Sequence, residues 1–436
     1  MNWRKVLQLT MIHVGVSITV VPVTSTLNRV MIADLGMPAF LVSFLVALPY
    51  LLSPLQVSIG NWADRRPILN RHRLPWILAG GLMAALGSYF TAHAAYWMTG
   101  DLALGLLAAV GAFAVWGVGV NAASVSYLSL LTELADEQWR SRAISVMWTV
   151  MILSTIAVSL GLAQMLQPYS EQALYTAFGA IWLASSLLVL LGGLGVEPPA
   201  DSREGPVHHT ADNPVVAFRL LAQNPVARRF FLYLLLVLVS IHAQDVLLEP
   251  FGAEALGMSV AMTSRLTSIW GAGVFITLTG GLPLLKRLGK KRSANLGAAV
   301  AALAFALISV TGILGLPIPF MASVFLLGLG GGLMTVSNLS FMLDMTVPQA
   351  AGLYIGAWGV ANFAGQAVGN MVSGLLRDAI LALTGNPVVG YVAVFGMEIL
   401  GLLLAIWLFR RIDVGEFRRN AELRLHEALS LAGGGG

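Results

Sequence analysis

The sequence predicts an all-α, polytopic membrane protein with 12 transmembrane helices in two pseudo-symmetric six-helix bundles. Three observations support this prediction: the composition is apolar, long apolar segments recur along the chain, and the second half repeats the pattern of the first. Of the 436 residues, 57% are hydrophobic and 11% are charged, whereas a soluble domain carries roughly 25% charged residues. Too few polar side chains are present to coat a water-facing surface, so lipid must be the outer solvent.

Twelve apolar segments are long enough to be membrane spans. Each holds about 20 or more mostly apolar residues, which is enough to cross roughly 30 Å of hydrocarbon as a helix. The first follows Met1-Asn-Trp-Arg-Lys5 and ends without a small-residue cleavage site, so we expect it to be retained. We place the spans near 6–33, 38–62, 74–97, 102–131, 143–168, 173–195, 230–250, 261–285, 294–314, 317–343, 351–381 and 388–409.

The basic residues are distributed unequally between the two sides of the predicted membrane. When the spans alternate in direction, all but three of the 25 Lys and Arg residues fall on one side; the exceptions are Arg29, Arg265 and Arg377. Basic residues accumulate on the cytoplasmic side of membrane proteins. We therefore expect a multi-pass protein of the inner (cytoplasmic) membrane with both termini in the cytoplasm. The net charge of +4 is then a topology signal, and we expect no nucleic-acid partner.

One long polar connection divides the chain into two similar halves. We predict a six-helix half at 1–195, a cytoplasmic linker at 196–229, a second six-helix half at 230–411 and a cytoplasmic tail at 412–436. The halves align in one register, in which Asn28 corresponds to Glu249 and Arg65-Arg66 to Lys286-Arg287; a shifted register aligns Glu133 with Asp344. Parallel six-helix repeats are typical of major facilitator superfamily transporters, whose substrate path runs between the halves.

A basic loop follows the second span. The segment Gly60-Asn-Trp-Ala-Asp64-Arg65-Arg66 resembles the cytoplasmic loop motif of that superfamily, Gly-x-x-x-Asp-Arg. The glycine permits close helix approach, Asp64 can meet a helix N-terminus, and the arginines can hold a cytoplasmic gate closed. The alternative is an ordinary turn rich in basic residues. The second half has Leu285 where Asp64 stands, so a charge switch would be asymmetric.

Ionisable residues within the seventh span form the most informative tract. An acid at the bilayer centre costs roughly 2.5–3.5 kcal/mol, so such residues normally face a cavity or a partner. His242, Asp245 and Glu249 fall at i, i+3 and i+7 on one helical stripe, with Gln244 beside them. We predict a functional face around Asp245. Glu249 has a second interpretation, as a carboxylate in the outer membrane interface.

Arg29 needs a partner at the outer end of the first span. Because Asn28 corresponds to Glu249 in the repeat, Arg29 and Glu249 should lie at matching heights beside the central cavity. We predict an Arg29–Glu249 ion pair that latches the halves, with Asp245 one turn deeper. Asp34, five residues along the same helix, should project at a different angle and is the poorer partner. The alternative is that Arg29 extends to lipid headgroups.

Three further features carry weaker predictions. Asn362, Gln366 and Asn370 recur every four residues in the eleventh span, as a polar stripe that either packs against another helix or lines a cavity. His13 lies in the first span, where we favour a hydrogen-bonded packing role. Glu398 lies midway along the last span, where it is either protonated or in contact with a partner helix.

Three motifs are not general transporter motifs. They are Thr24-Ser-Thr-Leu-Asn28-Arg29-Val-Met-Ile-Ala-Asp-Leu-Gly36-Met-Pro38, Gln244-Asp245-Val-Leu-Leu-Glu249-Pro250-Phe-Gly252 and Pro348-Gln-Ala-Ala-Gly352-Leu-Tyr-Ile-Gly356-Ala-Trp358-Gly359. These motifs resemble those of the PucC/LhaA bacteriochlorophyll-delivery family, a branch of the facilitator superfamily. In that family, light-harvesting members carry an Arg in the second span where this chain has Pro54-Leu55-Gln56.

The resemblance implies a protein that handles or delivers (bacterio)chlorophyll for assembly of light-harvesting complexes, with that pigment or a precursor as the bound molecule. His13 could ligate a chlorophyll magnesium, although we favour the packing role. Light-harvesting polypeptides or pigment-synthesis enzymes would be the protein partners.

Two functions remain open at this point. One is PucC-like pigment handling, and the other is ordinary secondary transport of a small solute, proton-coupled through Asp245 or Glu398. The chain has no Cys, which excludes disulfides, thiolate metal sites and cysteine nucleophiles. It also lacks a nucleophile elbow, a metal-ligand run and a nucleotide loop, so we expect neither enzyme activity nor a metal site.

Overall fold

The protein is described here from a computed structural model that covers residues 1–199, 225–346, 351–417 and 419. Within these ranges the regular structure is helical, apart from one isolated bridge between Ile68 and Arg71. Twelve helical segments are long and apolar enough to cross a membrane, six before residues 200–224 and six after them. The prediction of an all-α, twelve-span protein is confirmed. Most of the predicted linker and tail lies outside the described residues.

The first and second spans of the N-terminal half are each built from more than one helical piece. The first comprises α1 (Trp3–Ser17) and two π-helical pieces, η1 (Pro22–Leu27) and η2 (Val30–Asp34), and the second comprises α2 (Ala39–Leu51) and α3 (Leu55–Arg65). The remaining four are α4 (Leu74–Gly100), α5 (Leu102–Leu134), α6 (Glu137–Met165) and α7 (Glu171–Gly193).

The C-terminal half repeats this organisation, with a break in its first span. That span comprises α9 (Pro225–His242), the 3₁₀ turn η4 (Ala243–Val246) and α10 (Leu248–Leu256). The others are α11 (Val260–Leu288), α12 (Lys290–Ile313), α13 (Pro317–Asp344), α14 (Ala351–Thr384) and α15 (Pro387–Arg410).

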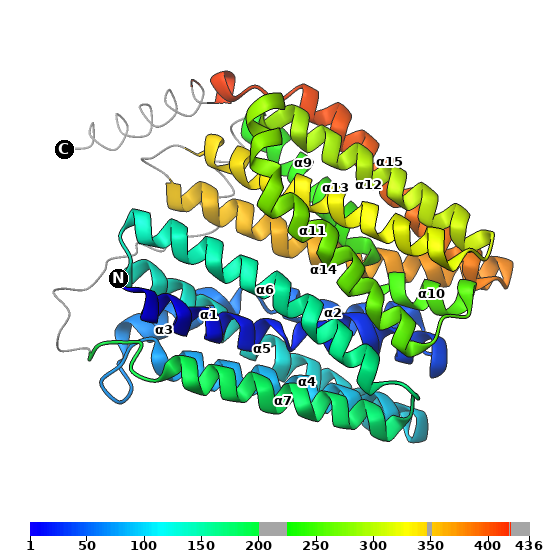
Figure 1. Ribbon diagram of the computed structural model, residues 1–436, viewed down its shortest axis with the longest axis horizontal. Coiled ribbons are helices and arrows are strands. Elements are labelled where there is room, and N and C mark those ends of the chain that lie inside the picture. Colours follow the sequence, from blue (N-terminus) through cyan, green and yellow to red (C-terminus); the bar gives the residue numbers. More distant parts are fainter. Residues whose placement is uncertain (200–224, 347–350, 418, 420–436) are drawn as a thin grey trace, which may run out of the picture.

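The two halves lie side by side along the length of the bundle (Figure 1). In that view α1–α7, in blue to green, lie below α9–α15, in green to red, and Met1 lies at the left. We call the end that carries Met1 and the turn at 66–73 the terminal end. The opposite end, which carries the turns at 35–38 and 257–259, is the far end.

The same close helix contact occurs in both halves. A Cβ added to Gly119 of α5 would lie 2.6 Å from the carbonyl oxygen of Gly80 in α4, and a Cβ added to Gly330 of α13 would lie 2.8 Å from that of Gly297 in α12. Only glycine allows backbones to approach so closely. These equivalent pairs agree with the internal repeat in the sequence.

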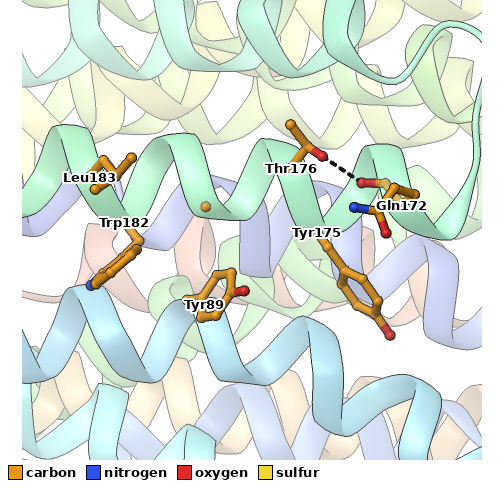
Figure 2. A pocket seen from close by; sticks show the side chains of 7 residues that line it. Tyr89, Gln172, Tyr175, Thr176, Trp182 and Leu183 are labelled. Carbon is orange, nitrogen blue, oxygen red and sulfur yellow. Dashed lines mark hydrogen bonds between the residues drawn. The ribbon is translucent and has the colours of Figure 1, made fainter.

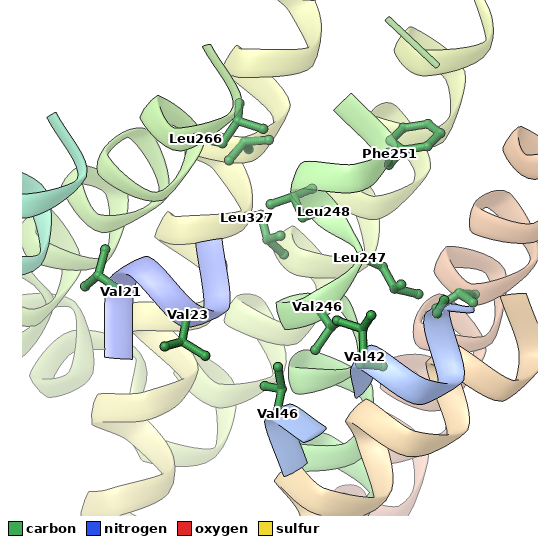
Figure 3. Packing of buried hydrophobic residues seen from close by; sticks show 14 of the residues in the cluster. Val21, Val23, Val42, Val46, Val246, Leu247, Leu248, Phe251, Leu266 and Leu327 are labelled. Carbon is green, nitrogen blue, oxygen red and sulfur yellow. The ribbon is translucent and has the colours of Figure 1, made fainter. Parts of the chain in front are cut away.

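The halves share an apolar core toward the far end. Here α2 packs along α14, and α6 packs along α11. Val42 and Val46 of α2 gather with Val246 and Leu247 of the other half (Figure 3), and each of these side chains is at most 1% exposed.

Hydrogen bonds between the halves also concentrate at the far end. Within the described ranges, every such bond joins residues in the far-end part of the spans, whereas α3, at the terminal end, packs against α5 of its own half. The structure therefore represents an arrangement in which the far end is closed. The bonds join Thr26 and Ser159 to Ser264, Asn28 to residues 245–249, Arg29 to Met258, and Asp378 to Ala39 and Phe40.

Candidate functional site at the contact between the halves

The first span contains π-helical turns that begin at a proline. Pro22 has no backbone N–H, so the α-helical bond to the residue four positions earlier cannot form there. The span continues as η1 and η2, with bonds to the fifth preceding residue. The hydroxyls of Thr24 and Ser25 donate to the carbonyl oxygens of Val20 and Val21 at 3.0 and 2.7 Å. These side chains satisfy carbonyl groups that have no water available to them inside a membrane.

The seventh span is interrupted at η4, and a side chain from the other half donates a hydrogen bond to a carbonyl group that the interruption leaves free. Pro250 lies in the first turn of α10 and cannot donate to the carbonyl of Val246, four residues earlier. The side-chain amide of Asn28 supplies the missing donor, with Nδ2 2.9 Å from the Val246 oxygen. The N-terminal half thereby completes the backbone of a helix in the C-terminal half.

Asn28 also contacts Glu249, its counterpart in the internal repeat. Asn28 Nδ2 lies 3.4 Å from Glu249 Oε2, and the hydroxyl of Thr267 in α11 donates to Oε1 at 3.1 Å. Asn28 is fully buried and Glu249 is 5% exposed. The interpretation of Glu249 as an interfacial carboxylate is therefore wrong, because the side chain lies inside the contact between the halves.

The predicted Arg29–Glu249 latch is wrong as well. Arg29 forms its ion pair with Asp34, and its second terminal nitrogen donates to the carbonyl oxygen of Met258 at 3.3 Å. We expected Asp34 to point elsewhere because five residues do not complete an integral number of α-helical turns. In the π-helical η2, residues five apart lie above one another. Arg29 still joins the halves, but through a backbone oxygen.

The break divides the predicted stripe on the seventh span into two groups. Glu249 turns toward Asn28, while the carboxylate of Asp245 lies 2.7 Å from His242 Nδ1 and accepts a bond from Gln244 Nε2 at 2.6 Å. The side chains of His242 and Asp245 are each 28% exposed. The second group is therefore only partly buried, unlike Glu249.

An ionic cluster at the far end escaped the sequence analysis. Arg377 of α14 pairs with Glu254 at 2.8 Å and with the adjacent Asp378 at 3.0 Å. The carboxylate of Asp378 accepts bonds from the backbone N–H groups of Ala39 and Phe40 at the start of α2, where the helix dipole favours a negative charge. The sequence contains an indication of this cluster, since Arg377 is one of three basic residues on this side of the predicted topology.

Of the predicted gate motif, the structure describes the surroundings of Gly60, Arg65 and Arg66, and its gating role stays a prediction. Arg65 and Arg66 are exposed, and neither makes an ion pair with another described side chain. A Cβ on Gly60 would meet Val125 at 3.8 Å, an ordinary contact that does not require glycine. The side chain of Asp64 lies outside the described part of the structure.

A different basic residue of the same loop takes the buried position. Arg73, at the start of α4, is 2% exposed, and its Nε donates to Glu133 of α5 at 2.9 Å. In the second half, Lys290 at the start of α12 pairs with Asp344 of α13 at 2.7 Å. The register that aligned Glu133 with Asp344 therefore corresponds to the same ion pair in both halves.

The remaining polar candidates lie apart from this contact. In α14, Asn362 is exposed and accepts a bond from Gln366 at 2.5 Å, so these two do not hold α14 to another helix. Asn370 is 1% exposed. His13 is buried, and its Nδ1 lies 2.7 Å from the hydroxyl of Tyr127. This bond agrees with the packing role that we favoured.

The second span has its own polar contact at the position where the family resemblance departs. Gln56 donates to the Asn121 side chain, and Asn121 donates in turn to the carbonyl oxygen of Pro49 at 2.8 Å. The uncharged side chain of Gln56 therefore serves as a contact between α3 and α5.

A shallow pocket of about 250 Å³ lies on the flank of the N-terminal half (Figure 2). Tyr89 of α4 and Trp182, Tyr175 and Gln172 of α7 line it. It shares no residue with the contacts between the halves, so it lies outside the candidate site. Within the described residues, no group of three or more His, Asp or Glu side chains could hold a metal ion.

The fold is that of a major facilitator superfamily transporter. The chain is similar to the crystal structure of a bacterial homologue of the human lysosomal transporter Spinster in an inward-facing, unoccupied conformation. The TM-score is 0.71 at 14% identity, and the match covers 96% of this chain and 99% of that one. At this identity the likeness establishes the fold alone.

The chain belongs to the PUCC protein family, which matches residues 26–417. It is 30% identical over 418 residues to Protein PucC of Cereibacter sphaeroides, covering 91% of this chain and 89% of that protein. It is 28% identical over 413 residues to the bacteriochlorophyll synthase 44.5 kDa chain of Rhodobacter capsulatus, covering 93% and 94%. The family resemblance drawn from the three motifs is confirmed, and the role is related to photosynthesis.

Proposed function

We propose that this protein handles or delivers a (bacterio)chlorophyll-type pigment for assembly of light-harvesting or other photosynthetic complexes. The observation that carries the proposal is the family match over residues 26–417. Along nearly its whole length the chain resembles both a PucC protein and a protein named as a bacteriochlorophyll synthase chain. Light-harvesting polypeptides or pigment-synthesis enzymes are the partners that fit this role, in a setting of membrane lipid.

The position of the family motifs supports the proposal. Asn28, from the first motif, bonds to Val246 and Glu249 of the second. These residues lie between the halves, where facilitator proteins have their substrate path. Two of the three motifs that carry the family resemblance thus meet where a cargo-specific function would require them.

Purification from a phototrophic host is expected to recover the protein with a pigment that has the absorption spectrum of (bacterio)chlorophyll or a late precursor. The control is the same preparation from a host blocked in pigment synthesis. Deletion of the gene is expected to lower antenna absorbance and to leave solute uptake unchanged. Normal antenna levels together with the loss of one solute's uptake would contradict the proposal.

We also propose that the terminal end faces the cytoplasm of the inner or photosynthetic membrane. Reporter fusions at Asn70, Thr210, Lys290 and Leu425 are all expected to give a cytoplasmic signal, because all but three of the 25 basic residues lie on that side of the topology. A fusion at Asp101, in the turn between α4 and α5, is the control for the opposite side. A periplasmic signal at Thr210 would contradict the division into two six-span halves.

Ordinary secondary transport of a small solute is the second candidate. The partly exposed Asp245, held by His242 and Gln244, favours it, because ionisable groups within spans commonly mark ion or substrate paths. The deletion experiment separates the two candidates, since only this one predicts that uptake of a solute is lost.

A further inference from the structure

Glu398 is a carboxyl group buried in the last span without a hydrogen-bond partner. It lies midway along α15 and is 0% exposed, and neither of its oxygens bonds to any described residue. A bare carboxylate is strongly disfavoured in such surroundings, because neither water nor a donor compensates its charge. These surroundings therefore favour the neutral, protonated form of the group.

The side chain lies next to the break in the seventh span. Gly401, three residues later, shares a face of α15 with Glu398, and a Cβ added to Gly401 would collide with Oγ of Ser240 in α9. The helix α15 also packs against η4, the turn that carries Asp245. The buried carboxyl therefore lies on a helix that contacts both sides of the break in the seventh span.

Few other ionisable groups reach this part of the bundle. Among the elements packed against α15, which are α9, η4, α10, α12 and α14, the mid-span ionisable residues are His242, Asp245 and Glu249. The other ionisable residues of these elements and of α15 lie toward helix ends. They are Arg228, Arg229, Tyr233, Glu254, Lys290, Lys291, Arg292, Tyr354, Arg377, Asp378, Tyr391 and Arg410.

We propose that Glu398 is a proton-binding site whose occupancy is coupled to the position of the seventh span. On release, the proton passes from a Glu398 oxygen to solvent water. One proton is released in total, and Glu398 is left ionised. This inference goes beyond the proposed function, since it holds whether the cargo is a pigment or a small solute.

The coupling between proton release and the position of the seventh span follows from the surroundings that an ionised Glu398 would require. In the present arrangement, loss of the proton would leave a bare anion between α15 and α9. Release therefore requires the break at η4 to move, so that water or a donor reaches Glu398. Conversely, the protonated form allows α15 to pack tightly on α9 at Gly401, so proton binding favours the arrangement in which the far end is closed.

Infrared spectroscopy of the purified protein tests the protonation state without any cargo. At neutral pH, Glu398→Gln is expected to remove a carboxylic-acid C=O band that the unmodified protein shows. Glu171→Gln, at an exposed carboxylate, is the matched control and is expected to leave every such band in place. An unchanged band pattern in Glu398→Gln would overturn the proposal, because Glu398 would then be ionised.

Thiol labelling tests the coupling, and the absence of cysteine from the chain makes single-cysteine variants clean reporters. Ser264→Cys lies in the far-end contact at a fully buried position, and Thr99→Cys, at an exposed position, measures how pH alone changes thiol reactivity. Relative to that reference, labelling at position 264 with a membrane-impermeant maleimide is expected to fall severalfold as the pH is lowered.

In the Glu398→Gln background, the same labelling is expected to be low at every pH. An unchanged pH dependence in that background would overturn the proposal. Both measurements use the protein without pigment or solute. Their failure therefore differs from failure of the proposed function, which would appear as normal antenna assembly in the deletion strain.

Discussion

Asn28→Leu is expected to lower the thermal stability of the purified protein markedly and to impair pigment handling. The substitution removes the donor from two buried acceptors at once, the carbonyl of Val246 and the carboxyl of Glu249. Each buried acceptor left without a partner costs about 1–3 kcal/mol. Thermal unfolding in detergent measures the first effect, and antenna absorbance in the host measures the second.

A second substitution tests the reason for this loss. Pro250→Ala restores a backbone N–H four residues after Val246, so the helix can satisfy that carbonyl by itself. The Asn28→Leu/Pro250→Ala variant is therefore expected to recover part of the stability. Pro22→Ala in the Asn28→Leu background is the control, since residue 22 lies in the first span. Strictly additive effects of Asn28→Leu and Pro250→Ala on stability would contradict the conclusion that Asn28 supplies the hydrogen bond that Pro250 cannot donate.

Charge reversal at Arg29 is expected to be rescued by Asp34 and not by Glu249. Arg29→Glu and Asp34→Arg should each destabilise the far end, because each places like charges where an ion pair stands. Breaking a buried pair costs roughly 3–5 kcal/mol, and we expect the lower end of that range because the Asp34 side chain is 31% exposed. The double variant Arg29→Glu/Asp34→Arg should regain part of the stability and function.

The matched control exchanges Arg29 with the other acid. Arg29→Glu/Glu249→Arg is expected to be no better than the worse of its single variants, because Glu249 bonds to Asn28 and Thr267 instead. Rescue by Glu249→Arg, together with no rescue by Asp34→Arg, would contradict the ion pair in the structure. Both double variants are read by thermal unfolding and by antenna absorbance.

The spans and the repeat could be predicted because they depend on local composition. A run of about 20 apolar residues crosses a membrane wherever it occurs, and one register aligned Glu133 with Asp344 without knowledge of their partners. The partner of Arg29 could not be predicted in this way. It depends on a π-helical register in η2, which changes the direction of Asp34 and leaves no trace in the spacing of apolar residues.

Other contacts could not be predicted because the sequence does not show which of several residues forms them. Pro250 is visible in the sequence and predicts a free carbonyl at Val246, but nothing local identifies Asn28 as the donor. Similarly, several basic residues follow the second span, and counting them places the loop without showing which one is buried. In the structure the buried one is Arg73, whose Nε donates to Glu133.

The contact between Asn28 and Glu249 bears on how the two halves came to differ. Equivalent residues of two symmetric units touch each other only on the two-fold axis that relates the units. In an ancestor made of two identical six-helix chains, this position would have faced its own copy. Two glutamates there would have opposed carboxylates, which resist joint ionisation, and two asparagines would have offered no carboxylate to Thr267.

Gene fusion removes that constraint, because each copy can then change alone. The donor in one half and the acceptor in the other are a pairing that two copies of one identical chain could not form.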